Sequence, residues 1–340
     1  MLPVVESICT RVVKAPSRFP ARFPVGRVTS RLSHLLLALV WFTQASAADL
    51  EPAERLARMA AALGSLSYEG TVVYLHGNRL ESLRVVHRVE GGQVREHLVS
   101  LNGPMRTLIR EKGGVTCARS GSQPISVQGH GIGKDLFHAG VLDPGALGDH
   151  YGIHPLGATR VAGRDTEVVG VIPRDRLRYG YRFYLDRENG LPLKSDLMGQ
   201  RADPLEQIMF TSLNLLPAPG PASTAGAAPG QPRSERPAPD RLPWRFAALP
   251  PGFVLVMYDD WRDAGRQPVD HFVLSDGLAS VSVYVETDPR EGLEGGARIG
   301  AVHAVGRRVA GHQITVVGEV PLATVGMVLA GIRPGPGGRR

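Results

Sequence analysis

The side chains best suited to metal chemistry lie in one glycine-rich stretch of the chain. Four histidines fall within 25 residues there: His130, His138, His150 and His154. Zinc could be bound by His150 and His154 if their i, i+4 spacing were helical, but Pro155 disfavours helix at the residue before it. No His-Glu-x-x-His motif and no cysteine pair accompanies them. We therefore interpret these histidines as loop residues and predict neither a metal site nor a cofactor.

The same stretch contains a sequence that superficially resembles a phosphate-binding loop, residues 129–135. A P-loop needs glycine where Gln128 stands, and Ser or Thr where Asp135 stands. No strand-helix-strand unit surrounds the stretch, which argues against a dinucleotide fold, and no Gly-x-Ser-x-Gly elbow of a serine hydrolase is present. Because no catalytic motif is recognisable, we predict that the protein is not an enzyme.

The N-terminal segment, residues 1–47, is typical of a secretory leader. Two arginines precede the apolar stretch 35–42, and Ala45-Ser46-Ala47 forms an A-x-A cleavage site. The stretch is too short to span a bilayer, which needs roughly 20 residues; a short membrane anchor is the alternative. We predict cleavage between Ala47 and Ala48, and a mature protein that is exported and does not span the membrane.

The net charge of +7 is mostly a property of this leader. Six Lys or Arg residues and one Glu lie in residues 1–47, so the rest of the chain carries a net charge of only +2. Nucleic-acid binding needs a clustered basic face, so we predict no nucleic-acid partner. Cys117 is the one cysteine beyond the leader and cannot form an internal disulfide. The fold must therefore depend on its apolar core.

The first predicted domain, residues 48–216, opens with a helix and continues as strands. Leu56, Met59 and Leu63 recur at helical spacing after Asp49 as N-cap, and Gly64 is the predicted stop. Period-two patterns and turn residues predict strands at 71–76, 82–89, 94–101, 106–110, 115–119, 159–162, 167–172, 181–185, 192–197 and 206–215. Residues 129–152 are predicted to form short helices and loops. Consecutive strands with short turns indicate one large curved antiparallel sheet.

A linker rich in Pro, Ala and Gly, residues 217–241, precedes a second predicted domain, residues 242–332. Strands are predicted there at 253–257, 269–274, 278–285, 303–305 and 313–317. A closing helix is predicted after Pro321, because Leu322, Val325, Leu329 and Ile332 recur at helical spacing. Residues 333–340 form a tail that we expect to be disordered.

Two segments about 200 residues apart form one signature. The first is residues 67–74 (SYEGTVVY), continued by 80–88 (LESLRVVHR) and 101–104 (LNGP); the second is 275–280 (SDGLAS), continued by 281–285 (VSVYV). Further stretches are 181–186 (YRFYLD), 190–196 (GLPLKSD), 206–211 (EQIMFT), 249–253 (LPPGF) and 316–321 (VVGEVP). In this order, on both sides of a linker, they resemble the MucB/RseB family, the periplasmic negative regulators of the sigma-E envelope-stress response. The linker is longer than the family pattern suggests.

The resemblance implies an α+β fold, mostly antiparallel β. Its N-terminal domain would be a curved half-barrel sheet with helices, like that of the lipoprotein carriers LolA and LolB, followed by a smaller α/β C-terminal domain. It also implies a periplasmic protein that binds the periplasmic region of a membrane anti-sigma factor of the RseA/MucA type. The bound protein would shield that region from site-1 proteolysis, and lipopolysaccharide or lipid acyl chains would release it.

Two sets of residues are candidates for these interactions. The proposed lipid groove contains Tyr68, Val72, Tyr74, Leu83 and Val85, since an apolar concave sheet face suits an acyl chain. Their alternative role is ordinary sheet core. The proposed peptide-binding surface contains Trp244, Phe253, Tyr258, Trp261 and Tyr284, because aromatic residues often anchor interfaces. Trp244 and Phe253 could instead fill the core of the second domain.

Two other functional classes stay open at this stage. A periplasmic lipid or lipoprotein carrier would use the same N-terminal fold without needing residues 242–332. An envelope enzyme would need a polar residue essential for turnover, and none stands out. The sequence also leaves open whether the protein is a monomer or a homo-oligomer.

Overall fold

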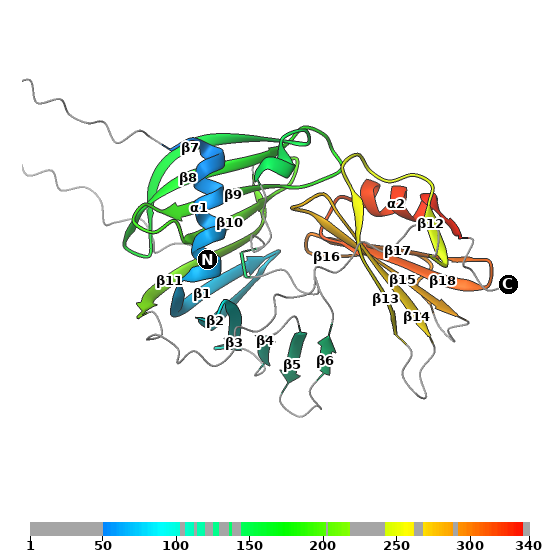
Figure 1. Cartoon of the computed structure of the whole chain (residues 1–340), viewed down its shortest axis with the longest axis horizontal. Coiled ribbons are helices and arrows are strands. Elements are labelled where there is room, and N and C mark those ends of the chain that lie inside the picture. The colour runs from blue at the N-terminus through cyan, green and yellow to red at the C-terminus, as the bar shows by residue number, and fades with distance from the viewer. Residues whose placement is uncertain are drawn as a thin grey trace, which may run out of the picture. The chain divides into compact units, whose positions relative to one another are not determined.

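The computed structural model of the chain describes ten stretches, which belong to one compact unit that begins at Asp49 (Figure 1). These are residues 50–102, 106–111, 114–119, 125–128, 136–137, 144–201, 203–217, 242–261, 268–287 and 292–335. The predicted leader, the phosphate-loop-like stretch 129–135 and most of the predicted linker and tail lie outside the described residues, as do His130 and His138.

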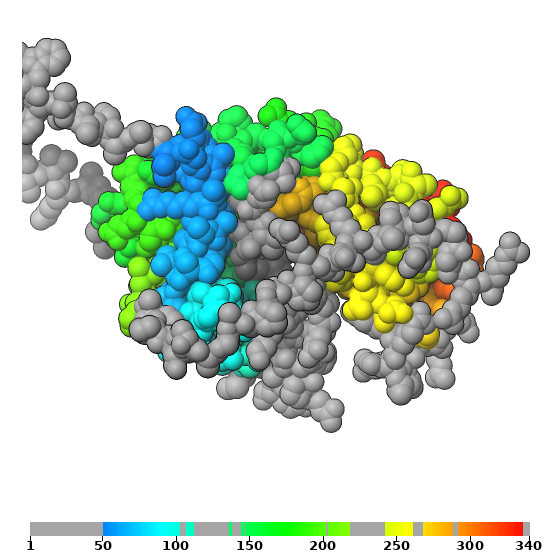
Figure 2. Space-filling model, viewed as in Figure 1, coloured from blue at the N-terminus to red at the C-terminus, as the bar shows by residue number. Residues whose placement is uncertain are grey.

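Helix α1 (Pro52–Ser65) opens the first domain and packs on its sheet. Its apolar stripe buries Leu56, Met59 and Leu63, while its opposite face is exposed at the surface (Figure 2). Glu51 and Glu54 form a reciprocal capping box at its start, which satisfies backbone N–H groups that the helix leaves unbonded. The N-cap is therefore Glu51 and not the predicted Asp49. The predicted stop at Gly64 was one residue short, because the helix ends at Ser65.

The first domain is built on one eleven-stranded sheet with strand order β6-β5-β4-β3-β2-β1-β11-β10-β9-β8-β7. All of its pairs are antiparallel. Its strands are β1 (Ser67–His76), β2 (Arg79–Glu90), β3 (Gln93–Ser100), β4 (Arg106–Glu111), β5 (Gly114–Arg119), β6 (Ile125–Gln128), β7 (Tyr151–Val161), β8 (Arg164–Pro173), β9 (Gly180–Asp186), β10 (Pro192–Met198) and β11 (Pro204–Leu216). The end strands β6 and β7 do not pair with each other, so the sheet is unclosed.

Strand β7 is longer than the sequence predicts. The sequence predicts a strand only at 159–162, and short helices and loops at 129–152, but β7 begins at Tyr151 and continues through Pro155. Proline is tolerated because β7 is an edge strand, where a missing backbone N–H leaves no neighbour unbonded. The pairing with β8 also shifts register between Pro155 and Ala158. Short helix η1 (Pro144–Leu147) lies just before the strand and contacts α1.

The core of the first domain includes residues from the stretch that was predicted to be loop. Phe137 and Leu147 are fully buried, and the ring of Phe137 stacks on that of Phe210 at a centroid distance of 5.5 Å. Both residues pack with the buried side chains of α1 and the inner sheet face. The glycine-rich stretch therefore contributes apolar anchors to the core, although its sequence shows no periodicity.

A buried polar cluster lies beneath the C-terminal end of α1. His87 stacks on Tyr68 at 4.5 Å, and its Nε2 lies 3.0 Å from the backbone oxygen of Leu63 in the last turn of the helix. Its Nδ1 lies 3.8 Å from Oε1 of Glu96. The other carboxylate oxygen of Glu96, Oε2, accepts a hydrogen bond of 2.6 Å from Nη1 of Arg110. The cluster therefore ties the helix end to strands β2, β3 and β4.

The second domain contains a six-stranded antiparallel sheet with order β13-β14-β15-β18-β17-β16, and a two-stranded ribbon of β12 and β19. The elements are β12 (Trp244–Phe246), β13 (Val254–Trp261), β14 (Val269–Ser275), β15 (Ser280–Thr287), β16 (Gly295–Ile299), β17 (Val302–Val309), β18 (His312–Gly318), α2 (Leu322–Gly331) and β19 (Ile332–Pro334). Helix α2 packs on β17 and β18. Strands β12, β16 and β19 were not predicted, and Ile332 begins β19 instead of ending the helix.

The predicted fold class is confirmed: the chain is mostly antiparallel β, with a large unclosed sheet, a second sheet domain and two α-helices among the described residues. No helix in the described stretches is long and apolar enough to cross a membrane.

Candidate binding groove

The five residues predicted to line a lipid groove lie on one face of β1 and β2. Val72 pairs directly with Leu83, and Gly70 pairs with Val85. Tyr68, Val72 and Val85 are fully buried, so for these three the structure favours the alternative role in the core. Tyr74 and Leu83 are only partly buried at the margin of that core and stay candidates for ligand contact.

The same sheet face contains three leucines on β2, β3 and β4, beside the polar cluster of His87, Glu96 and Arg110. Leu83 and Leu98 are partly buried and pack against the edge of the main core. Leu98 pairs with Leu108, which is also partly buried. An acyl chain that covered these leucines would gain about 0.8 kcal/mol for each CH₂ group removed from water.

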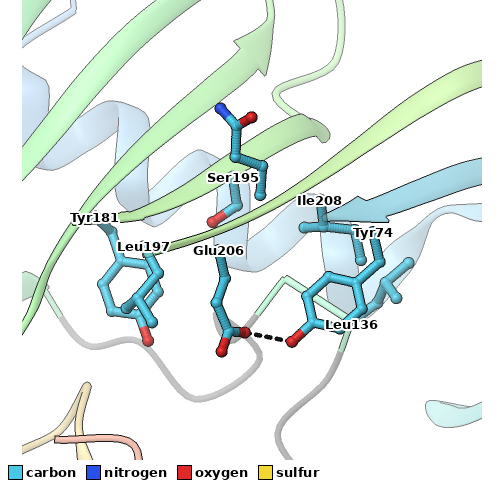
Figure 3. A pocket seen from close by; sticks show the side chains of 8 residues that line it. Tyr74, Leu136, Tyr181, Ser195, Leu197, Glu206 and Ile208 are labelled. Atoms are coloured by element: carbon cyan, nitrogen blue, oxygen red, sulfur yellow. Dashed lines mark hydrogen bonds between the residues drawn. The ribbon is translucent and has the colours of Figure 1, made fainter. Parts of the chain in front are cut away.

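A small cavity of about 20 Å³, room for about one water molecule, lies on this inner face around Tyr74 (Figure 3). Strands β1, β9, β10 and β11 and the short stretch 136–137 supply its side chains: Tyr74, Leu136, Tyr181, Ser195, Leu197, Glu206, Gln207 and Ile208. Leucine and isoleucine side chains therefore stand beside hydroxyl, amide and carboxylate groups. The lining is therefore mixed, and the space between these side chains is too small for an organic ligand unless they move.

Glu206 is the polar centre of the pocket. The hydroxyl of Tyr74 donates a short hydrogen bond to its Oε2, drawn as a dashed line in Figure 3, and its Oε1 accepts a hydrogen bond of 3.1 Å from the backbone N–H of Ala301. Burial and the neighbouring carboxylate raise the pKa of the Tyr74 hydroxyl far above its usual value. Tyr74 therefore stays protonated at neutral pH and acts as a hydrogen-bond donor.

Tyr181 provides a second hydroxyl at the pocket and reaches the second domain. It donates a hydrogen bond of 3.2 Å to Oε2 of Glu319. Its pKa is raised well above its usual value, first because of burial and then because of Glu319. Together with the Glu206–Ala301 bond, this contact joins the pocket to residues of the second domain. In the described stretches, no group of three or more His, Cys, Asp or Glu side chains is placed to hold a metal ion.

Sequence reasoning missed Tyr181, Ser195 and Glu206 as pocket residues. A usable signal was present in β11, where Glu206 alternates with the buried Ile208 and Phe210. An acidic residue at an inward position of an amphipathic strand needs a hydrogen-bond partner. Its partners, Tyr74 and Ala301, are more than 90 residues away along the chain, so local pattern could not supply them.

The five aromatic residues predicted to bind a peptide do not form one surface. Trp244 and Phe253 are buried in the core of the second domain. Tyr258 stacks on Phe272 of the same core at 4.8 Å, whereas Tyr284 lies on the opposite sheet face and stacks on His271 at 4.4 Å. Trp261 lies at the end of β13, and its side chain lies outside the description. Their role in partner binding stays a prediction.

Two antiparallel sheet domains, joined beside the pocket by the Glu206–Ala301 and Tyr181–Glu319 hydrogen bonds, define this chain as a two-domain β-sheet protein. Residues 51–242 match the family model of the MucB/RseB N-terminal domain, and residues 238–333 match that of the MucB/RseB C-terminal domain. The chain therefore belongs to the MucB/RseB family, and the predicted resemblance is confirmed.

Relatives of established identity match along nearly their whole lengths. The sigma factor AlgU regulatory protein MucB of Pseudomonas aeruginosa is 35% identical over 323 residues, which cover 90% of this chain and 98% of that protein. The sigma-E factor regulatory protein RseB of Escherichia coli K12 is 28% identical over 286 residues, covering 82% and 90% respectively. These relatives are regulatory proteins, in agreement with the prediction that the chain is not an enzyme.

Solved structures show the same two-domain architecture. The complex of Pseudomonas aeruginosa MucA and MucB contains a chain that matches with a TM-score of 0.63 and 33% identity, over 84% of this chain and 99% of that one. A crystal structure of MucB matches with a TM-score of 0.62 and 34% identity, over 83% and 98%.

Proposed function

We propose that this protein is a periplasmic regulator that binds the periplasmic region of a membrane anti-sigma factor of the RseA/MucA type. The observation that carries the proposal is the match of both domains to MucB, including the MucB chain of a solved complex with MucA. A bound anti-sigma factor would retain its sigma factor, so the protein would be a negative regulator of a sigma-E-type response.

Binding would act by occlusion. A segment held against two domains at once gains affinity because the second contact is intramolecular. While it is held there, a site-1 protease could not accommodate it as an extended substrate. The hydrogen bonds of Tyr181 with Glu319 and of Glu206 with Ala301 support this arrangement, since they connect the two domains that would share the partner.

Release would come from a lipid that competes for the protein. The partly buried leucines of β2, β3 and β4, namely Leu83, Leu98 and Leu108, offer an apolar face for acyl chains. Lipopolysaccharide fits this role, because its acyl chains would cover that face and its polar part would remain near the rim. A lipid can release the partner only if it binds the partner-free protein more tightly than the complex.

The test is a binding assay with residues 48–340 and the purified periplasmic region of the host's anti-sigma factor, with and without lipopolysaccharide. We expect saturable binding that lipopolysaccharide reverses, and protection of the bound region from site-1 cleavage. Leu98→Gln should bind the partner but resist release by lipid. Ile109→Gln is the matched control, because Ile109 lies on the adjacent strand β4 but is exposed on the other sheet face.

Two results would contradict this proposal. If the protein retains lipopolysaccharide but never binds the anti-sigma factor, the regulator role fails and a lipid carrier becomes the better explanation, a function that should persist after deletion of residues 242–332. If lipid releases the partner equally well from Leu98→Gln and from the control, the acyl chain does not bind on the inner face of β2 to β4.

A further inference from the structure

One arginine of the first domain is buried against the second domain. Arg178 precedes β9, and Asp276 lies in the turn between β14 and β15. Nη1 of Arg178 donates a hydrogen bond of 2.6 Å to Oδ2 of Asp276. The side chains of both residues have 0% exposure. Two opposite charges from different domains are therefore paired entirely out of contact with water.

The guanidinium makes further contacts around this ion pair. Its Nη2 donates a hydrogen bond of 2.6 Å to the backbone oxygen of Pro251, and its Nε donates one of 3.1 Å to Oδ1 of Asp175. It also lies 5.4 Å from the ring centroids of both Tyr151 and Phe253. The planar guanidinium thus contacts two separate turns of the second domain, at Pro251 and at Asp276.

Asp276 is fixed from its own side as well. Its Oδ1 accepts hydrogen bonds from the backbone N–H groups of Leu278 and Ala279, at 3.0 and 2.8 Å. Its Oδ2 accepts a second hydrogen bond, of 2.9 Å, from the hydroxyl of Tyr151 in the first domain. Both partners of the ion pair are therefore oriented by groups that cannot move without disturbing a turn or a strand.

Such a pair determines geometry more than it adds stability. The cost of removing two charges from water offsets most of their attraction, but loss of one partner leaves the other charge buried and uncompensated. A rearrangement that separates Arg178 from Asp276 while keeping Asp276 out of water meets that penalty, whereas Arg178 retains Asp175 of its own domain at 3.0 Å. A planar group with several fixed donors also restricts orientation, which a lysine ammonium would not.

Leu177, which precedes Arg178 in the chain, adds a contact to a third part of the second domain, helix α2. Thr324 in the first turn of α2 donates a short hydrogen bond from its hydroxyl to the backbone oxygen of Leu177. Segment 175–178 therefore contacts the Pro251 turn, the Asp276 turn and α2.

We propose that Arg178 is a positioning residue for partner binding: through Asp276 and Pro251 it holds the two domains in the one arrangement in which both contact the same partner. The inference rests on the proposed function and adds to it the residue that makes the two domains act together. Three of the stretches that carry the family resemblance meet here or beside it, since they contain Asp276, Pro251 and Glu319.

The experiment compares Arg178→Gln with Arg176→Gln in residues 48–340. Arg176 is two positions away and exposed, so its substitution matches the loss of charge without affecting the ion pair. Domain arrangement is measured as the distance distribution between spin labels on Asn214→Cys and Thr287→Cys, both exposed, in a Cys117→Ser background. Affinity is measured with the purified periplasmic region of the host's anti-sigma factor.

We expect one narrow distance distribution in the parent and in Arg176→Gln, and a broad one in Arg178→Gln. If the competent arrangement falls to about a tenth of the population, the Kd rises about tenfold. Arg178→Lys should give an intermediate result, since it keeps the charge but loses the planar contacts. Unfolding of the second domain, followed by tryptophan fluorescence, serves as the control for folding in each variant.

An unchanged, narrow distribution in Arg178→Gln would overturn the inference, and so would a broad distribution with unchanged Kd. If Arg178→Gln fails to fold, Arg178→Lys takes its place. An unchanged, narrow distance distribution in Arg178→Lys, or a broad distribution with unchanged Kd, would then overturn the inference. If the parent itself does not bind the anti-sigma factor but Arg178→Gln broadens the distribution, the proposed function fails, while the fixing of domain arrangement by Arg178 stands.

Discussion

Strands β3 and β4 contain a buried and an exposed ion pair side by side, which permits a controlled test of what burial does to a charge. Glu96 pairs with Arg110 at 2.6 Å, with side-chain exposures of 2% and 19%. In the adjacent register position, Glu111 pairs with Arg95 at 3.3 Å, with exposures of 48% and 54%. We predict that Glu96→Gln destabilises the first domain strongly and that Glu111→Gln does so only slightly.

The magnitudes follow from the fate of the arginine that remains. Loss of one partner from a fully buried pair costs about 3–5 kcal/mol. Because Arg110 is 19% exposed and regains some water, we expect about 2–3 kcal/mol for Glu96→Gln. An exposed pair contributes about 0–1 kcal/mol, so Glu111→Gln should stay below 1 kcal/mol.

The assay is equilibrium unfolding in urea, with a separate probe for each domain. Trp244 and Trp261 both lie in the second domain, and the remaining tryptophan, Trp41, lies in the predicted leader. Tryptophan fluorescence of residues 48–340 therefore follows the second domain, and hydrogen exchange of the β2 to β4 amides follows the first. Glu96→Gln should lower the protection of those amides while the fluorescence transition of the second domain shifts much less.

The reasoning would be refuted by equal destabilisation from the two substitutions. That outcome would mean that the position of the Glu96 carboxylate under α1 does not isolate it from water. A stabilising effect of Glu96→Gln would be equally damaging, because it would show that the desolvation cost of Glu96 exceeds its attraction to Arg110 in the folded protein.

Three further predictions concern single side chains. Burial lowers the pKa of His271 to about 4, so the unfolded chain takes up a proton more readily than the folded one. The stability of the second domain should therefore fall as the pH drops from about 6.5 toward 4. His271→Phe should flatten this pH dependence in urea melts followed by fluorescence. Phe137→Ala should destabilise the first domain by about 3–5 kcal/mol, because it leaves a cavity at a fully buried site against Phe210. Urea melts followed by circular dichroism measure this loss. A loss below about 1 kcal/mol would place Phe137 outside the core. Tyr74→Phe removes the donor to Glu206 and should cost about 1.5 kcal/mol in the same assay, whereas no change would show that water replaces the hydroxyl.

Most strands could be predicted from the sequence because their signal is local. Strand β2 shows a period-two pattern bounded by turn residues, and its predicted range lies within the observed one. The predicted strand at 159–162 covers only part of β7, and the edge position that lets β7 include Pro155 is a property of the whole sheet. Strand β16 was missed because all five of its residues are exposed, so no apolar alternation is present.

The candidate site could be predicted only in part, for a related reason. The face shared by Tyr74 and Leu83 follows from alternation along two adjacent strands. The polar groups that line the pocket do not follow from this alternation. Tyr74 contacts Glu206 through the pairing of β1 with β11, the first and last strands of the domain. Likewise, the pairing of Arg178 with Asp276 depends on how two domains pack, and nothing in the sequence distinguishes Arg178 from the nearby Arg174 and Arg176.

The strand order has a consequence for how the first domain folds. Strands β1 to β6 pair with their sequence neighbours, and so do β7 to β11, so each half is a meander that can form locally. The two halves are joined by the pairing of β1 with β11, in which Ser67 lies opposite Leu216. Closing a loop of that length delays contact formation. We therefore expect this central pairing to be the slow step, and the sheet cannot be completed until the last strand of the domain, β11, is available to pair with the first.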